Sequence, residues 1–369
     1  MSPPLWTTEL RAHSRPGRTF CPVWPAPGLE RDDASVSVAR WTDPRTIAEA
    51  HAWLREAAER NGRRTVGAIE QPHVRPWSTV FRAPTDRGDV YLKLCGLSQA
   101  HEPSLTALLA RSAGDLVPDV IAIHPREPWM LLADGGGKVG EVLSGSALLD
   151  TWAALLPRYA DLQRALIGHE PEVLRCGTPD RRLERLAGDL RLAMEDDEVV
   201  SAPGAAFGPR ERERLRALLP GIEDRCAALA SSGIGPSVQH DDLHDSNVLT
   251  NGARTVVFDW GDASLTHPFL SLGVLLDAAG HRARLDQHDA PILRLRTAYL
   301  EAWTDLLPRR ALEDAADLGA QLSTLTRALS WYRVVKLDDG ALEGEPTMMG
   351  EYLGNILSAF GPDGRRRWV

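Results

Sequence analysis

Residues 239–262 read QHDDLHDSNVLTNGARTVVFDWGD. Within this stretch Asp242 is followed, after four intervening residues, by Asn247. That spacing is the one between the catalytic aspartate and the metal-binding asparagine of the kinase catalytic loop. The aspartate of such a loop orients and deprotonates an attacking hydroxyl. The spacing therefore predicts a phosphoryl-transfer centre with Asp242 as its base.

The second half of the stretch predicts a β-hairpin. An apolar run begins at Val248, Asn251-Gly252 is a strong two-residue turn signal, and residues 255–258 are β-branched and aromatic enough to form the returning strand. Asp259 ends that strand, so the hairpin should bring it back beside Asn247. A carboxylate and an amide oxygen together suit Mg²⁺, a hard cation.

The order His-x-Asp-Leu-His-x-x-Asn, followed by an apolar strand and Asp-Trp-Gly, resembles the aminoglycoside phosphotransferase family. These are small-molecule kinases with the protein-kinase-like fold. The resemblance covers roughly residues 64–340. It implies that Asp242 is the catalytic base, that Asn247 and Asp259 hold magnesium, and that the phosphate donor is a nucleoside triphosphate, most often ATP. Relatives in that family act on antibiotics, amino sugars, homoserine, choline or methylthioribose, so the resemblance leaves the acceptor open.

One residue departs from the family pattern. Glycine commonly stands before the catalytic aspartate, whereas this chain has Asp241. Its carboxylate could raise the pKa of Asp242, face solvent, or bind an amine of the acceptor. We expect it to face the acceptor, because adjacent residues of an extended loop tend to project in opposite directions.

A kinase also needs a lysine to hold the α- and β-phosphates and a glutamate to orient that lysine. Lys93 is the only cation of the strand-like run 89–94, and Glu102 begins a helical pattern nine residues later. Ser78 and Thr79 lie one hairpin before the Lys93 strand, where their hydroxyl and N–H groups could contact phosphate. The chain has neither a glycine-rich loop there nor a GxxxxGK[ST] sequence, so an ordinary hairpin turn at residues 78–79 is an equal alternative and a P-loop kinase is disfavoured.

Two other functions remain open. His240 and His244 are four residues apart among carboxylates, which on a helix would suit a transition-metal phosphohydrolase. A catalytically silent nucleotide-binding relative is the other. For both histidines we expect a structural role in the loop, because Asp242 already fills the role of the base.

Charge and composition limit the kinds of partner that the protein can have. The formal net charge of −9 argues against general nucleic-acid binding, and four scattered cysteines suggest neither a zinc site nor a disulfide framework. No stretch reaches 18 consecutive apolar residues, and the first residues lack the apolar core of a signal peptide. We therefore expect a cytoplasmic protein without a membrane span. The oligomeric state stays open.

The expected architecture is a bilobal α+β fold of the protein-kinase-like type. Residues 1–63 should form an N-terminal arm and a helical extension, with a helix opening at Asp43-Pro44 and ending near Arg60. Residues 64–133 should form a small lobe with an antiparallel sheet, and residues 134–369 a mainly helical lobe with the catalytic loop and the acceptor site. A hinge is expected at residues 132–134, and long helices at 148–165, 210–230, 291–306 and 311–337.

The acceptor should lie near Asp242 against the helical lobe. Trp331 and Tyr332 could stack on a sugar ring, although buried helix aromatics are the more common reading. Further acidic or polar candidates are Asp262, His267, Asp277, Asp338, Asp339, Glu343, Glu345 and Glu351. The acidic stretch after residue 337 would suit an aminated substrate; a solvated loop is the alternative.

Overall fold

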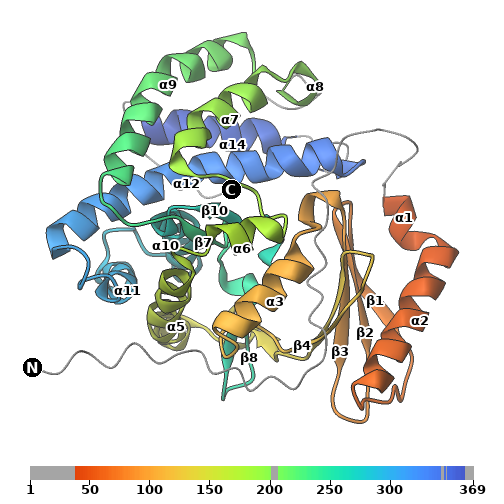
Figure 1. The fold of residues 1–369 in the computed structure, drawn as a ribbon. Helices are drawn as coiled ribbons and strands as arrows, with labels where there is room; N and C mark the ends of the chain where they lie inside the picture. The colour runs from red at the N-terminus through yellow and green to blue at the C-terminus, as the bar shows by residue number, and fades with distance from the viewer. Residues whose placement is uncertain (1–37, 201–206, 342–344, 346, 362–369) are drawn as a thin grey trace, which may run out of the picture.

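The computed structural model describes residues 38–200, 207–341, 345 and 347–361. Its first part is a five-stranded antiparallel sheet. The strand order is β1 (Glu70–Arg75), β2 (Ser78–Ala83), β3 (Val90–Cys95), β5 (Trp129–Ala133) and β4 (Val120–Ile123). The apolar residues of β3 and β5 are buried because helices cover both faces of this sheet (Figure 1).

Helices α1 (Val38–Thr42) and α2 (Pro44–Arg60) cover one face of the sheet. Asp43 caps α2 as expected, accepting the backbone N–H of Arg45 at 2.8 Å. The apolar stripe of α2 shares one core cluster with buried residues of β2, β3 and β5, for example Leu54 with Leu92 and Leu131. A boundary at residue 63 therefore does not separate two packing units, because α2 completes the core of the small lobe.

Helix α3 (Glu102–Ser112) covers the other face and joins the two lobes. The short 3-10 helix η1 (Leu97–Gln99) connects it to β3. Leu105 and Leu109 of α3 are fully buried and belong to the core cluster of the large lobe. The helix that begins with Glu102 is thus held from both sides.

The large lobe is mainly helical, as expected. Its described helices are α4 (Val139–Val142), α5 (Gly145–Leu166), α6 (Glu170–Arg175), α7 (Leu183–Glu195), α8 (Asp197–Val200), α9 (Pro209–Ala230), α10 (Ser271–Ala283), α11 (Ala290–Glu301), α12 (Arg309–Leu337) and α14 (Met348–Phe360). The four long helices expected from periodicity correspond to α5, α9, α11 and α12, although α11 ends five residues early. No described helix is both long enough and apolar enough to cross a bilayer.

The predicted hairpin of residues 248–258 is confirmed. Strands β8 (Val248–Thr250) and β9 (Thr255–Val257) pair antiparallel, and β6 (Gly137–Lys138) adds to the edge of β8. Gly136 has a φ of 96°, and a Cβ there would lie 2.2 Å from the Thr250 carbonyl oxygen, so the link between the lobes needs glycine at this point.

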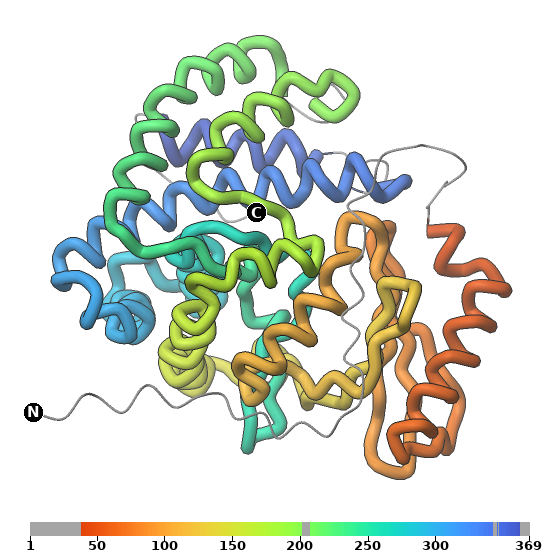
Figure 2. The backbone as a smooth tube through the Cα atoms, viewed as in Figure 1, coloured from red at the N-terminus to blue at the C-terminus, as the bar shows by residue number. Residues whose placement is uncertain are grey.

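A second small sheet frames the loop that precedes this hairpin. Strand β7 (Ser237–Gln239) pairs antiparallel with β10 (Ser264–Thr266). The 3-10 helices η2 (Asp245–Asn247), η3 (Trp260–Asp262) and η4 (Pro268–Leu270) complete the segment. In Figure 2 the chain from β7 to β10, in teal, runs between the small lobe and α12. Residues 240–262 are thereby fixed at the junction of the lobes.

Candidate active site

Lys93 of β3 contacts two carboxylates, one from the start of α3 and one from the end of the β8–β9 hairpin. Its Nζ atom lies 2.6 Å from Oε2 of Glu102 and 2.5 Å from Oδ1 of Asp259. Burial alone would lower the pKa of Lys93, but the two carboxylates outweigh burial and raise it, so the ammonium stays charged. The lysine–glutamate pair expected from the sequence is present, and Asp259 is a second partner of the same lysine.

The β8–β9 hairpin places Asn247 and Asp259 at its open end. The N–H of Phe258 donates to the carbonyl of Asn247 at 3.1 Å, and Asp259 is the next residue. Asp259 has a φ of 63°, a left-handed conformation that aspartate tolerates better than most side chains. Its side chain is 40% exposed, so its carboxylate is accessible from solvent.

Asn247 also contacts the expected base. Its Nδ2 donates to the carbonyl of Asp242 at 2.9 Å and to Oδ2 of Asp242 at 3.1 Å. Since the amide nitrogen is engaged in this way, the amide oxygen is the atom left to bind a metal ion. An amide oxygen and the Asp259 carboxylate are the kind of ligands that Mg²⁺ takes in proteins, so these two residues fit a magnesium ion.

His240 and His244 both serve the loop. The ring of His240 donates from Nε2 to the carbonyl of Phe258 at 2.8 Å and accepts the N–H of Asp242 at Nδ1. Both of its nitrogens are therefore engaged by the backbone rather than directed at a metal ion. His244 accepts the N–H of Ser246, and its Nε2 lies 3.4 Å from Oδ2 of Asp242. In the described part of the chain no group of three or more His, Cys, Asp or Glu residues could hold a metal ion.

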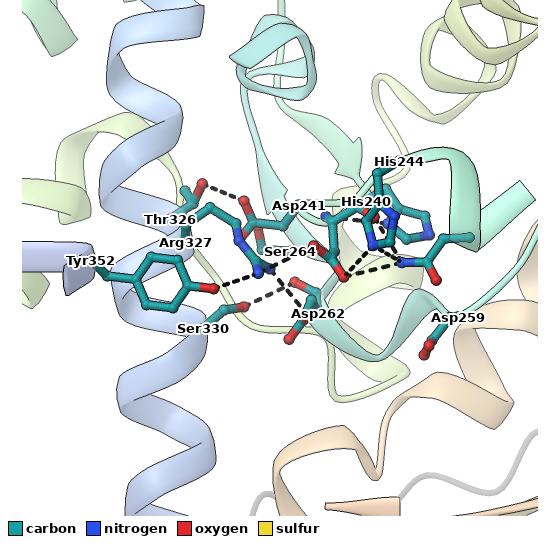
Figure 3. A network of polar contacts seen from close by, with 12 residues as sticks. His240, Asp241, His244, Asp259, Asp262, Ser264, Thr326, Arg327, Ser330 and Tyr352 are labelled. Atoms are coloured by element: carbon teal, nitrogen blue, oxygen red, sulfur yellow. Dashed lines mark hydrogen bonds and ion pairs between the residues drawn. The ribbon is translucent and has the colours of Figure 1, made fainter. Parts of the chain in front are cut away.

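Sequence reasoning missed Arg327 of α12. Its guanidinium lies 3.2 Å from Oδ1 of Asp242 and 3.2 Å from Oδ2 of Asp262, and it donates to the hydroxyl of Tyr352 at 3.0 Å (Figure 3). Burial would raise the pKa of Asp242, but Arg327 and His244 outweigh it and hold that pKa well below its usual range. The sequence did carry a signal for this contact: Arg327 stands among apolar residues of a predicted helix. An arginine buried in this way needs an acidic partner.

The expectation for Asp241 is wrong. Its side chain is buried and accepts the hydroxyl of Thr326, from α12, at 2.6 Å (Figure 3). It therefore faces α12 rather than solvent or Asp242. The backbone at Asp241 has a φ of 66°, which turns the side chain into the large lobe. That conformation favours glycine, the residue common at this position of the family pattern.

The expected hydroxyl contact from Thr79 to phosphate is also contradicted. Its hydroxyl is fully buried, donates to the carbonyl of His73 at 2.7 Å and accepts from Gln71 at 2.9 Å. Ser78 is buried too, opposite Arg75 at the end of a tight hairpin whose turn is Pro76-Trp77. This matches the alternative of an ordinary hairpin turn, and a phosphate contact from Ser78 stays a prediction.

Most residues that were expected to contact the acceptor are buried or contact other residues of the chain. Tyr332 donates to Asp196 at 2.9 Å. Trp331 is buried, as is His267, the pKa of which burial lowers to about 3. Asp338 is buried as well and accepts the N–H groups of η1. Among the acidic candidates, Asp262 is linked to the base through Arg327. Glu343 lies outside the described residues.

A small sheet lobe with a lysine–glutamate pair, joined to a helical lobe in which the Asp242 loop leads into the β8–β9 hairpin, is the arrangement of the protein-kinase-like fold. Solved structures share this fold. The ethanolamine kinase of Plasmodium vivax superposes with a TM-score of 0.60 at 10% identity, over 90% of this chain and 96% of the other. A choline/ethanolamine kinase family protein from Mesorhizobium loti has a TM-score of 0.54 at 17% identity, over 86% and 96% of the two chains.

A macrolide 2′-phosphotransferase from Brachybacterium faecium superposes with a TM-score of 0.50 at 18% identity, over 85% of this chain and 99% of the other. No match is found among curated proteins. The model of the phosphotransferase enzyme family, which is the aminoglycoside phosphotransferase family of the sequence comparison above, matches residues 76–313. The chain belongs to this family and is a phosphotransferase.

Proposed function

We propose that the protein transfers the γ-phosphoryl group of ATP to a hydroxyl of a small molecule. The observation that carries this proposal is the pairing of Lys93 with Glu102 and Asp259 beside a loop in which Asn247 contacts Asp242. This arrangement has a cation for the phosphates, oxygen ligands for a metal ion and a carboxylate for the acceptor, which are the parts that phosphoryl transfer requires.

The donor side uses Lys93. Its contact with Glu102 would hold the ammonium in place while the α- and β-phosphates of ATP take over the side now occupied by Asp259. Asp259 and the amide oxygen of Asn247 would hold magnesium. When bound, that ion neutralises charge on the phosphate oxygens.

The acceptor side uses Asp242. Because its pKa lies below the usual range, Asp242 is ionised at neutral pH and can accept a hydrogen bond from the acceptor hydroxyl. It orients that hydroxyl in line with the γ-phosphorus atom. It takes up the proton as the new P–O bond forms and the bond from the γ-phosphorus to the bridging oxygen breaks, which releases ADP.

The acceptor is a small alcohol, and an aminoglycoside or amino sugar is the first class to test. Support for a cationic acceptor from the acidic stretch after residue 337 is reduced, since Asp338 is buried in another contact. Asp262 remains a carboxylate that one residue, Arg327, links to the base. We place the reaction in the cytoplasm, where ATP is abundant.

The test is a screen of aminoglycosides, amino sugars, macrolides, choline, ethanolamine and other small alcohols for acceptor-dependent ADP release with added magnesium. The Asp242→Asn variant serves as the background. We expect an acceptor that stimulates ADP release by the wild-type protein and not by the variant. Nucleotide binding without turnover on any acceptor would instead support the silent relative, and phosphatase activity with a copurified transition metal would support the hydrolase.

A further inference from the structure

Helix α12 contacts the catalytic loop through two adjacent residue pairs. Thr326 donates to Asp241 at 2.6 Å, and the next residue, Arg327, lies 3.2 Å from Asp242. Consecutive residues of one helix thus bind consecutive residues of the loop, across 85 positions of sequence. Figure 3 shows both side chains of α12 directed toward this loop.

These two residues of α12 lie outside the part of the chain that the family model matches. The match ends at residue 313, the fifth residue of α12. The catalytic loop lies within the matched part of the chain, whereas the residues that contact it from α12 lie beyond the end of the match. Asp241, which stands where the pattern commonly has glycine, is the loop residue that meets this helix.

The carboxylate of Asp242 is held at both oxygens. Arg327 contacts Oδ1, while Asn247 and His244 contact Oδ2. A carboxylate fixed in this way cannot rotate freely about its Cβ–Cγ bond, and its orientation decides where the acceptor hydroxyl sits. A displacement of about 1 Å in such a group can lower turnover by about 10²-fold.

We propose that Arg327 is a positioning residue for the catalytic base, and that the hydrogen bond from Thr326 to Asp241 sets the register between α12 and the catalytic loop. This inference rests on the proposed function and deepens it. Arg327 acts through Asp242 rather than on the substrate. Its planar fork is suited to the task because it contacts Asp242 and Asp262 at the same time, whereas a lysine is a single point of charge.

The test compares kcat with KM in variants of the full chain, using the acceptor found in the screen. Arg327→Met should lower kcat by about 10²-fold, because the base loses its orientation, while KM for ATP changes by less than about threefold. Arg327→Lys should recover part of kcat. Thr326→Val, which keeps the volume and removes the hydroxyl, should lower kcat by a smaller factor with the same unchanged KM for ATP.

Matched controls lie on the same helix. Arg309→Met removes an exposed arginine that pairs with Glu301 and Glu313, and Thr324→Val removes a hydroxyl that bonds only to the helix carbonyl of Gln321. Both should keep kcat. Since Arg327→Met leaves two neighbouring carboxylates without their cation, the double variant Asp262→Asn with Arg327→Met restores the local net charge and should fold. Its kcat should stay well below that of Asp262→Asn alone, which is the reference for this comparison.

Three outcomes decide the proposal. A low kcat with unchanged KM for ATP in both Arg327→Met and the charge-matched double variant supports it. If the wild type is active and these variants keep a normal kcat, the positioning role of Arg327 is overturned, while the proposed function stands. The same holds if kcat of Arg327→Lys is as low as that of Arg327→Met. A wild type that transfers phosphate to no acceptor overturns the proposed function and this inference together.

Discussion

Trp77, at the turn between β1 and β2, packs edge-on against Trp331 of α12, with ring centroids 5.4 Å apart and rings inclined by 82°. The hairpin that precedes the Lys93 strand is thereby tied to the large lobe. Asp338, at the end of the same helix, forms a second tie by accepting the N–H groups of Leu97 and Ser98 at 2.8 and 3.3 Å. One helix therefore contacts both the base and the loop between Lys93 and Glu102.

If these ties align the lobes, Asp338→Ala should weaken ATP binding. The N–H groups of Leu97 and Ser98 lose a buried acceptor, which should lower the free energy of unfolding by about 1–3 kcal/mol. We expect the dissociation constant for magnesium-ATP to rise several-fold, measured by calorimetric titration. Glu351→Ala, an exposed position on α14, is the control. A destabilised variant with unchanged ATP affinity would show that the contact serves stability alone.

Asp242→Asn should preserve the fold and ATP binding and lower phosphoryl transfer by about 10²- to 10⁴-fold, the usual range for a positioned general base. Steady-state ADP release with the identified acceptor measures it. Asp245→Asn provides a comparison in the same loop, because Asp245 pairs with Arg282 at 3.2 Å and meets the base at one remove, through His244 at 3.8 Å. The loss of turnover in Asp245→Asn should therefore be much smaller. Near-normal turnover of Asp242→Asn would remove Asp242 from the role of base.

Asp259→Ala should weaken ATP binding mainly when magnesium is present, because Asp259 is an expected metal ligand. Without the metal the change should be small or even favourable, since Lys93 loses a carboxylate that competes with phosphate. Titrations of ATP with magnesium and with a chelator separate the two cases. An equal loss of affinity in both conditions would contradict a ligand role.

Asp241 should make stability depend on pH. Burial raises its pKa to about 6 in the folded protein, against about 3.9 in an unfolded chain. Between these values the folded state holds more protons, so the contribution of Asp241 is fully present below about pH 4 and is lost as pH rises through about 6. The free energy of unfolding of the wild type, relative to Asp241→Asn, should thus fall by about 1–3 kcal/mol from pH 4 to 6.5. Urea denaturation at several pH values measures it, and a constant difference would refute the assignment.

Local patterns account for the parts of the site that the sequence predicted. The β8–β9 hairpin follows from the Asn251-Gly252 turn and two short apolar runs, and its geometry alone brings Asp259 back to Asn247. Lys93 and Glu102 could be paired in advance because a kinase needs a strand lysine and a glutamate on the following helix, and both lie in local patterns of those types. Helix α2 was predicted with its cap and its end, since both signals lie within its own residues. The sequence pattern of α2 does not indicate which face of the sheet the helix covers.

The sequence by itself determined the fold class, the family and the order of the catalytic parts, because each motif consists of residues close together in the chain and the family resemblance connects the motifs in order. Only the tertiary structure decided which side chains meet across long separations. Arg327 reaches Asp242, Thr326 reaches Asp241 and Asp338 reaches Leu97 because α12 packs across both lobes. No local periodicity encodes that docking. The direction of Asp241 likewise follows from a left-handed backbone that the surrounding packing holds in place, and not from the identity of its neighbours.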